Sequence, residues 1–254
     1  MATSKLKRSR GARLGQHFLM HPRIAERMVM VAGVEKGDVV LEIGPGKGML
    51  TKALLERAGK VVAVETDAAL FEGLRERFAK EIAEDRLELV HGDIRTHPLP
   101  SAPYHVVANI PYYITGEIIR LFLEAEHQPR SMTLLVQKEV AERISRTKKE
   151  SILSLSVKAY GEPHYEFTVP RGAFVPAPRV DSAALSIRGI SRNRFASCAD
   201  EQRFFALIHT GFAHKRKKLS KNLADAGFGA EGLAEGVRAE DLSLEAWLAL
   251  VQKR

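Results

Sequence analysis

Cysteine is almost absent from this chain of 254 residues. Cys198 is its only cysteine, so no disulfide can form within the chain, and a zinc site built from several cysteines is excluded. We expect Cys198 to be a partly buried side chain without a chemical role, and we predict no metal site.

Long apolar runs are missing as well. No stretch approaches the 18 or so uninterrupted apolar residues of a membrane-spanning helix, so we predict no membrane span. Hydrophobic residues make up 45% and charged residues 28%, which is typical of soluble globular proteins. We therefore expect a cytoplasmic protein, and a monomer.

Acidic residues are too few to balance the basic ones, and the net charge is +8. Much of the excess lies in two short windows: Lys5, Lys7, Arg8, Arg10 and Arg13, and Lys215, Arg216, Lys217, Lys218 and Lys221. A single charge run is more often a solvated face, but two in one basic chain favour a nucleic-acid partner. We predict RNA contacts from both windows (all of these residues except Lys5), with residues 1–13 forming a disordered basic arm.

Helix-like and strand-like patterns alternate along most of the chain. Helices are expected over 22–33, 49–58, 68–83 and 116–126, and strands over 39–44, 61–65, 87–93, 105–110 and 132–137. Such alternation predicts right-handed βαβ units and a parallel sheet. Two later strands, over 164–170 and 183–188, are expected to pair antiparallel at the sheet edge.

The last part of the chain has a different character. Residues 200–254 show only helical patterns, near 200–213, 215–226 and 240–252. The predicted fold class is therefore α/β, a Rossmann-like and mostly parallel sheet with an antiparallel edge, followed by a small helical domain. We predict the domain boundaries at 14–189 and 190–254.

A glycine-rich turn follows the first predicted strand. Its glycines, in Glu42-Ile43-Gly44-Pro45-Gly46-Lys47-Gly48, allow a sharp turn and a close approach to a ligand at the start of a helix. Glu65 ends the second strand, where a carboxylate can accept both ribose hydroxyls, and Asp93 ends the third, within reach of an adenine edge. Together they indicate an adenosine-containing ligand; alternatively, the glycines only make a tight turn.

The identity of that ligand follows from what the chain lacks. A dinucleotide would require a second mononucleotide-binding half, and none is visible in the sequence. S-adenosylmethionine requires only one half, and this favours it as the cofactor of a methyltransferase.

The stretch Asn109-Ile110-Pro111-Tyr112 ends the fourth predicted strand. An adenine amine is a poor nucleophile that needs neutral acceptors for its N–H bonds, and an Asn side-chain oxygen and a nearby backbone carbonyl can serve. Pro111 stiffens the turn, and Tyr112 offers a ring for stacking an extruded base.

These motifs resemble those of the rRNA adenine N6-methyltransferase family, which includes the KsgA and Erm groups. The resemblance is carried, over about residues 12 to 190, by Gly15-Gln16-His17-Phe18-Leu19, Glu42-Ile43-Gly44-Pro45-Gly46, Asn109-Ile110-Pro111-Tyr112 and Phe174-Val175-Pro176-Ala177-Pro178-Arg179-Val180-Asp181-Ser182. His17 is a departure, because the family often has Asn at that place.

The resemblance also implies roles for individual residues. Asn109 and the Ile110-Pro111 backbone would accept from the target amine, while Tyr112 and Phe174 would sandwich the adenine. The implied cofactor contacts are Gln16, His17, Leu19, Gly44, Gly46, Glu65, Asp93, Ile94 and Asn109.

The flanking residues resemble the KsgA group more closely. This implies dimethylation of two adjacent adenines in a hairpin loop near the 3′ end of 16S rRNA, and a role in maturation of the small ribosomal subunit, whose pre-mature form would be the partner. Three alternatives remain open: methylation of large-subunit rRNA as in the Erm group, an assembly factor whose catalysis is incidental, and a DNA adenine methyltransferase.

Overall fold

The computed structural model describes residues 16–214, 216–229 and 232–252. Residues 1–13, predicted as a basic arm, and Lys215 lie outside this range. None of the helices in the described ranges is both long and apolar enough to cross a membrane. In the same ranges, no three His, Cys, Asp or Glu side chains are arranged to hold a metal ion.

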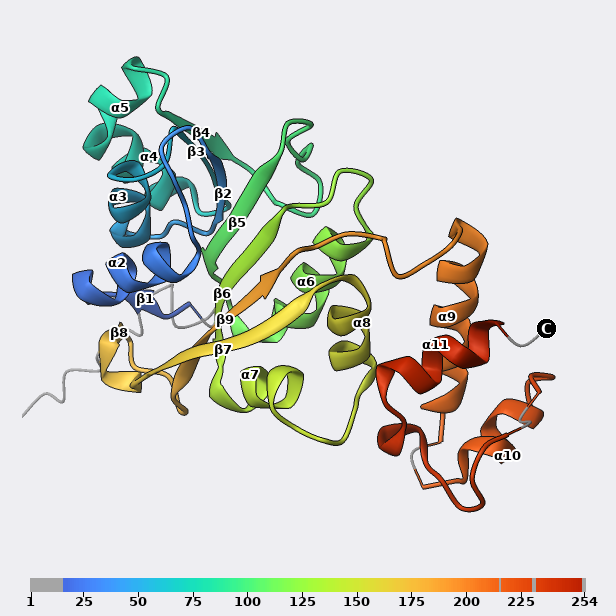
Figure 1. Ribbon diagram of the computed structural model, residues 1–254. Helices are drawn as coiled ribbons and strands as arrows, with labels where there is room; N and C mark the ends of the chain where they lie inside the picture. The colour runs from blue at the N-terminus through green and yellow to red at the C-terminus, as the bar shows by residue number, and fades with distance from the viewer. Residues whose placement is uncertain (1–15, 215, 230–231, 253–254) are drawn as a thin grey trace, which may run out of the picture.

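One seven-stranded sheet forms the centre of the molecule (Figure 1). Its strand order is β4-β3-β2-β5-β6-β9-β7, with bounds β2 (Val39–Ile43), β3 (Lys60–Glu65), β4 (Leu87–His91), β5 (Tyr104–Asn109), β6 (Ser131–Gln137), β7 (Glu162–Val169) and β9 (Ser182–Arg188). The first five strands in this order are parallel, whereas β9 runs antiparallel to both β6 and β7. The structure thus confirms the predicted α/β fold with its antiparallel edge.

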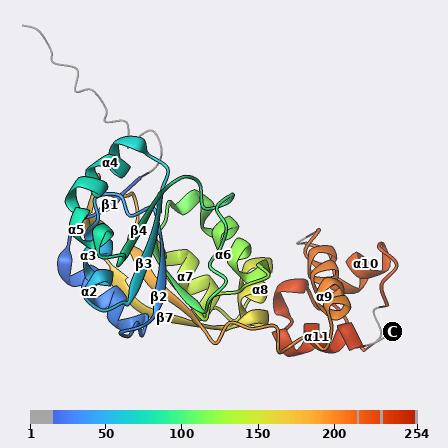
Figure 2. The ribbon, with the colours of Figure 1, turned by 90° about the horizontal axis from the view of Figure 1, so that it is seen from above.

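Alternate side chains of each strand pack on opposite faces of the sheet. In β2, Leu41 and Ile43 belong to one hydrophobic cluster, and Val40 belongs to the other. Helices α2 (Pro22–Val31), α3 (Met49–Leu55), α4 (Ala68–Arg77) and α5 (Ala79–Ala83) cover one face, and α6 (Thr115–Glu124), α7 (Lys138–Ser145) and α8 (Ile152–Tyr160) cover the other (Figure 2). Two helical layers agree with the predicted parallel sheet, because strands buried on both faces are apolar throughout.

Two helical predictions and one prediction of burial were wrong in detail. The helix expected over 68–83 is interrupted at Phe78, whose backbone leaves the helical region and whose ring is buried beside Gly48. The helix expected over 215–226 begins only at Leu219, because Asn222 bonds the carbonyls of Gly211 and His214 and so holds a turn before it. Cys198, expected to be partly buried, is exposed in the first turn of α9 (Cys198–Gly211).

Two helices and a short sheet were not predicted. Helices α7 and α8 connect β6 to β7, and α8 is apolar on more than one side because it contacts two clusters. The short sheet pairs β1 (Phe18–Leu19) with β8 (Phe174–Val175), so that Phe18 faces Val175 and Leu19 faces Phe174. Strands of two residues are below the length at which alternation can be recognised in a sequence.

The C-terminal helices pack around Trp247, which is fully buried. They are α9, α10 (Leu219–Ala224), the 3-10 turn η3 (Ala239–Asp241) and α11 (Leu244–Gln252), and no strand occurs among the described residues after 200. Leu155 and Ala159 of α8 belong to the same cluster, and α8 lies between the sheet and α9 and α11 (Figures 1 and 2). The division of the chain near residue 190 stays a prediction.

Gly211 marks the closest approach within this helical cluster. A Cβ atom at Gly211 would lie 2.4 Å from Cη2 of Trp247 and 2.8 Å from Cδ1 of Leu219. We expect Gly211→Ala to lower the free energy of unfolding by about 1–3 kcal/mol, because added volume in a packed core forces its neighbours to shift. Urea unfolding followed by circular dichroism measures this change.

Gly73 in α4 provides the control, since a Cβ atom there would meet nothing within 4 Å. Gly73→Ala should leave stability unchanged or raise it by up to about 1 kcal/mol, as alanine is the better helix former. Equal effects of the two substitutions would contradict the close packing at Gly211.

Candidate functional site

A pocket forms where β2, β3 and β5 end. Its lining combines four segments of the chain: Gln16, His17 and Phe18; Gly44 and Gly46; Glu65; and Asn109, Ile110, Pro111 and Tyr112. The structure therefore brings together most of the residues predicted to bind the cofactor and the target amine. Phe18 was not predicted, although it stands within the first motif.

The turn after β2 requires glycine. Gly44, Gly46 and Gly48 all have positive φ, between 58° and 74°, which other residues rarely adopt. A Cβ atom at Gly46 would also lie 2.9 Å from the Phe18 ring. The glycines thus permit both the turn and the close approach of the N-terminal segment.

Glu65, at the end of β3, is buried and fixed in place by backbone groups. Its Oε2 accepts from Gly46 N at 3.0 Å, and its Oε1 accepts from Asp67 N at 2.9 Å. Each carboxylate oxygen has two lone pairs, so each can accept one further hydrogen bond. A ligand with two neighbouring hydroxyls, such as a ribose, matches this arrangement.

Asn109 ends β5 and contacts the N-terminal segment. Its Nδ2 donates to the carbonyl of His17 at 2.9 Å. This bond fixes the orientation of the amide and leaves Oδ1 as the end that can accept from a substrate. The next turn begins at once, since the Pro111 carbonyl accepts the Ile114 N–H at 3.2 Å.

Tyr112 is half-buried and held at both ends. Its hydroxyl lies 2.6 Å from Oγ of Ser182, and its ring lies 5.7 Å from the His17 ring. Burial raises the pKa of Tyr112, the bond to Ser182 opposes this, and the charge of Asp181 adds to it. Tyr112 therefore acts as a neutral, oriented ring.

His17 joins the pocket to the loop after β8, because its Nδ1 lies 2.7 Å from the carbonyl oxygen of Pro176. Together with Phe18, it lines the pocket, whose volume is about 50 Å³. A neighbouring cavity of about 20 Å³, lined in part by Lys47 and Leu50, extends under the glycine turn. Pockets for small molecules typically measure about 300–1,000 Å³, so this pocket is smaller than a complete ligand.

Glu42, in β2, lines the smaller cavity and is fully buried. Among the described residues, no group donates a hydrogen bond to its Oε2. Burial raises the pKa of Glu42 to about 8, and the nearby charge of Glu65 contributes to this. Hydrogen bonding to Thr51 opposes this rise, and a carboxyl with a pKa of about 8 is mostly protonated at pH 7, so Glu65 supplies most of the negative charge beneath the glycine turn.

Four predicted residues have less direct positions. Asp93 follows β4 and does not line the pocket. It pairs with Arg95, whose guanidinium and backbone N–H lower the pKa of Asp93. Ile94 is buried in the core beneath the sheet. Leu19 and Phe174 are buried side by side in the β1–β8 pair, so Phe174 does not line the pocket and the ring beside Tyr112 is that of His17. Their assigned roles stay predictions.

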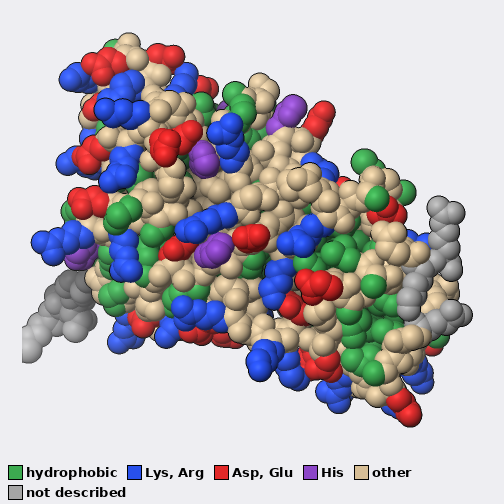
Figure 3. Space-filling view, in the orientation of Figure 1, with side chains coloured by type: hydrophobic (Ala, Val, Ile, Leu, Met, Phe, Trp, Pro, Cys, Tyr) green, Lys and Arg blue, Asp and Glu red, His purple; other side chains and the backbone are tan. Residues whose placement is uncertain are grey.

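Four of the five predicted RNA-binding residues of the C-terminal window lie in the described ranges, and all four are exposed. Lys217 lies 3.7 Å from Asp225, and Lys218 lies 3.6 Å from Glu235, while Arg216 and Lys221 are exposed nearby. Figure 3 shows Lys and Arg side chains spread over the face in view, with acidic side chains between them. A role in RNA binding stays a prediction for each of these residues.

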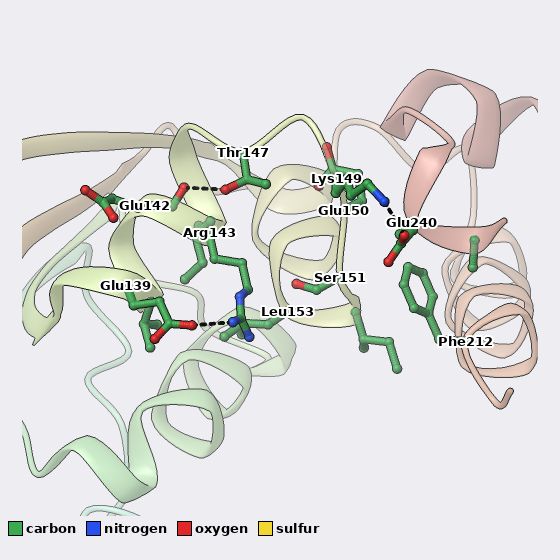
Figure 4. A pocket seen from close by; sticks show the side chains of 14 residues that line it. Glu139, Glu142, Arg143, Thr147, Lys149, Glu150, Ser151, Leu153, Phe212 and Glu240 are labelled. Atoms are coloured by element: carbon green, nitrogen blue, oxygen red, sulfur yellow. Dashed lines mark hydrogen bonds and ion pairs between the residues drawn. The ribbon is translucent and has the colours of Figure 1, made fainter. Parts of the chain in front are cut away.

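A larger cavity, of about 730 Å³, lies elsewhere, between α7, α8 and the C-terminal helices (Figure 4). Arg143 pairs with Glu139 at one end, and Lys149 pairs with Glu240 at the other. None of its lining residues belongs to the predicted site. Volume alone therefore does not locate the chemistry in this molecule.

Comparison with known proteins places this site in a family. The family model described as ribosomal RNA adenine dimethylase matches residues 8–253. Ribosomal RNA small subunit methyltransferase A of Dehalococcoides mccartyi is 41% identical, and the match covers 93% of this chain and 86% of that protein. The protein of the same name from Fusobacterium nucleatum is 36% identical, and the match covers 94% and 95% of the two chains.

Solved structures agree over nearly the whole chain. The 23S rRNA methyltransferase ErmE has a TM-score of 0.77 and 27% identity, over 92% of this chain and 98% of that one. A dimethyladenosine transferase from Plasmodium falciparum has a TM-score of 0.76 and 25% identity, over 92% and 96%. With a family model spanning almost its full length, the chain belongs to the ribosomal RNA adenine dimethylase family.

Proposed function

We propose that this protein uses S-adenosylmethionine to dimethylate N6 of two adjacent adenines in the 3′-terminal hairpin loop of small-subunit rRNA. The observation that carries the proposal is the placement of Asn109. Its amide is oriented by His17, next to the glycine turn and to Glu65. Membership of the family makes the protein an adenine-modifying enzyme, and the small-subunit methyltransferases among its relatives point to the substrate.

The residues around the pocket fit S-adenosylmethionine, which when bound supplies an electrophilic methyl group on a sulfonium. Glu65 can accept from the ribose hydroxyls, and the backbone of Gly44 and Gly46 can lie against the ligand without a Cβ atom in the way. The remaining cofactor contacts that we propose are Gln16, His17, Leu19, Asp93, Ile94 and Asn109. We also propose that Gln16–Leu19 moves outward as the cofactor enters, since the pocket that His17 and Phe18 line is too small.

The target amine needs two acceptors for its N–H bonds. Asn109 Oδ1 is one, because the other end of the amide is committed to His17. We propose the Ile110 carbonyl as the second, since one of the two lone pairs of the Pro111 carbonyl is already engaged by Ile114 within the turn. Neither acceptor changes charge with pH, so the geometry of the amine is held without a base.

Tyr112 supplies the ring on which the extruded adenine stacks. Its bond to Ser182 fixes the ring while leaving it half-buried at the pocket. Phe174 can join the other side of the base only if the β1–β8 pair opens, because its ring is buried there. That opening would accompany the movement of Gln16–Leu19, which belongs to the same pair.

The remaining proposals concern the substrate's context. We place the protein in the cytoplasm as a monomer that acts on pre-mature small subunits, with contacts from the basic residues of both charged windows. Methylation of large-subunit rRNA is the second candidate, because the 23S rRNA methyltransferase ErmE shares the fold over 92% of the chain.

The test incubates small subunits from a strain lacking this modification with the protein and S-adenosylmethionine, and maps methylated nucleotides by mass spectrometry. Two dimethylated adenines near the 3′ end support the proposal. Methylation of deproteinised large-subunit rRNA in a parallel reaction, with none of the small subunit, would overturn it in favour of the second candidate.

In the same assay, Asn109→Ala should lower kcat by about 100- to 1,000-fold, the usual loss when one oriented hydrogen-bonding group is removed from an active site. Asn193→Ala, at an exposed position after β9, is the matched control and should retain full activity. A kcat for Asn109→Ala within tenfold of the wild type would contradict the role given to this amide.

The protonated state of Glu42 predicts a dependence of stability on pH. The folded protein keeps this proton up to about pH 8, whereas an unfolded chain loses it near pH 4.3. Between these values the unfolded chain binds fewer protons, so the free energy of unfolding falls as the pH rises. From pH 5 to pH 8, the wild type should lose on the order of 3 kcal/mol more than Glu42→Gln.

Urea unfolding of both proteins at several pH values measures this difference. Glu26→Gln, at an exposed position on α2, should follow the wild-type profile. Parallel profiles for wild type and Glu42→Gln would show that Glu42 is charged in the folded protein.

A further inference from the structure

Large hydrophobic side chains are exposed at few places in the described part of the chain. The five are Met20, Met30, Tyr113, Val175 and Val180. A single exposed apolar residue is ordinary in a soluble protein. Four of these five, however, lie in or next to β1, β8 and η1 (Tyr112–Ile114) or in the loop after β8, and these segments contain or contact residues of the candidate pocket. We call Met20, Tyr113, Val175 and Val180 the apolar rim.

Contacts already described hold these segments together. His17 lies 2.7 Å from the Pro176 carbonyl and 5.7 Å, ring to ring, from Tyr112. Met20 N donates to the Ala173 carbonyl at 2.9 Å, beside the β1–β8 pair. Met20 and Val175 are therefore connected to the pocket through β1 and β8, and Tyr113 through η1 (Tyr112–Ile114), while Val180 lies in the loop after β8 that contains Pro176.

Tyr113 is the most exposed member of the rim, and the turn explains why. In η1, successive side chains point in different directions, so Tyr112 faces the pocket and Ile114 packs on the core of the sheet. Tyr113, between them, is 73% exposed. It thus follows directly in sequence the residue on which the target adenine is proposed to stack, and its side chain is open to solvent.

The charge near the rim favours nucleic acid over protein. Arg171 and Arg179 are exposed in the segments on either side of Val175, while Asp181 is engaged by the Arg171 N–H. An exposed ring with cations nearby matches an unpaired nucleotide, whose base stacks and whose phosphate is negative. A partner protein with an apolar surface would offer no negative charge to Arg171 and Arg179.

We propose that Tyr113 is a stacking platform for the nucleotide next to the target adenine, and that the apolar rim holds the loop while the target base enters the pocket. This inference rests on the proposed function and adds a residue that positions the RNA without touching the reacting amine. It also gives a reason for an aromatic ring in solvent at this position.

The test measures KM and kcat for Tyr113→Ala on small subunits that lack the modification. KM should rise by about 5- to 100-fold, the effect of losing one base stack. Affinity for S-adenosylmethionine, measured by calorimetry, should be unchanged. Tyr113→Trp, which keeps an aromatic ring, should have a KM close to that of the wild type. A KM for Tyr113→Trp that is raised as much as that of Tyr113→Ala would overturn the proposal.

Met30, on α2 and 58% exposed, provides the matched control outside the rim. Met30→Ala should behave as the wild type, and so separates a specific platform from a general effect of exposed apolar surface. If Tyr113→Ala also has a KM within twofold of the wild type, the platform does not exist. The proposed function would stand in that case, provided that the wild type methylates the subunit.

A second arm identifies the occupant. Small subunits are assembled on rRNA carrying one abasic nucleotide, placed in turn on either side of the two target adenines and at each of the two adenines, with methylation followed at the remaining target. At the stacked position, wild type and Tyr113→Ala should have the same KM, because no base remains to stack. A Tyr113→Ala defect that is undiminished on every abasic substrate would overturn the proposal and indicate a protein contact.

Discussion

Parallel strands must all end at the same edge of their sheet, and the residues that follow them are therefore collected in one place. In this protein β2, β3 and β5 are neighbours, so the glycine turn, Glu65 and Asn109 meet although they are distant in sequence. The Gly46–Glu65 hydrogen bond then fixes the turn to the strand beside it. The antiparallel β9 adds Ser182, which orients Tyr112 from the other side. The catalytic arrangement follows from strand order more than from any single motif.

The N-terminal segment adds a second constraint. His17 and Phe18 line the pocket, and His17 contacts Pro176 while Phe18 belongs to the β1–β8 pair that also contains Phe174. Leu19, predicted to contact the cofactor, and Phe174, predicted to contact the adenine, are thus paired in one short sheet. A movement that admits one ligand also changes the surroundings of the other, which suits an enzyme that must admit two substrates to a narrow space. Glu42, protonated beneath the turn, allows this packing without a second buried negative charge.

Much of this was predictable from the sequence, and the failures have physical causes. The strands and the residues at their ends were predicted because apolar runs ending in Gly, Glu or Asn are a local signal. The small volume of the pocket was not, since it depends on where His17 and Phe18 lie relative to strands far along the chain. Phe174 shows the same limit: the motif indicates its importance but not that its ring is buried against Leu19. Ser182 and Phe18 could have been found, because both stand inside recognised motifs. Helix α7 could also have been predicted, because its sequence has helical periodicity: Val140, Ala141 and Ile144 lie on one side, and Glu139 pairs with Arg143 on the other.

Helix α8 packs on the sheet with Val157 and Tyr160, and on the C-terminal helices with Leu155 and Ala159. Helix α8 therefore belongs to the hydrophobic core of the sheet and to that of the C-terminal helices. The Lys149–Glu240 ion pair also connects the segment before α8 to the C-terminal helices. An exchange of C-terminal helices between relatives, made to alter which RNA is recognised, would have to carry the matching face of α8 with it. The unit that evolution or an engineer can transplant is thus larger than the segment after residue 190, and it includes part of the methyltransferase fold itself.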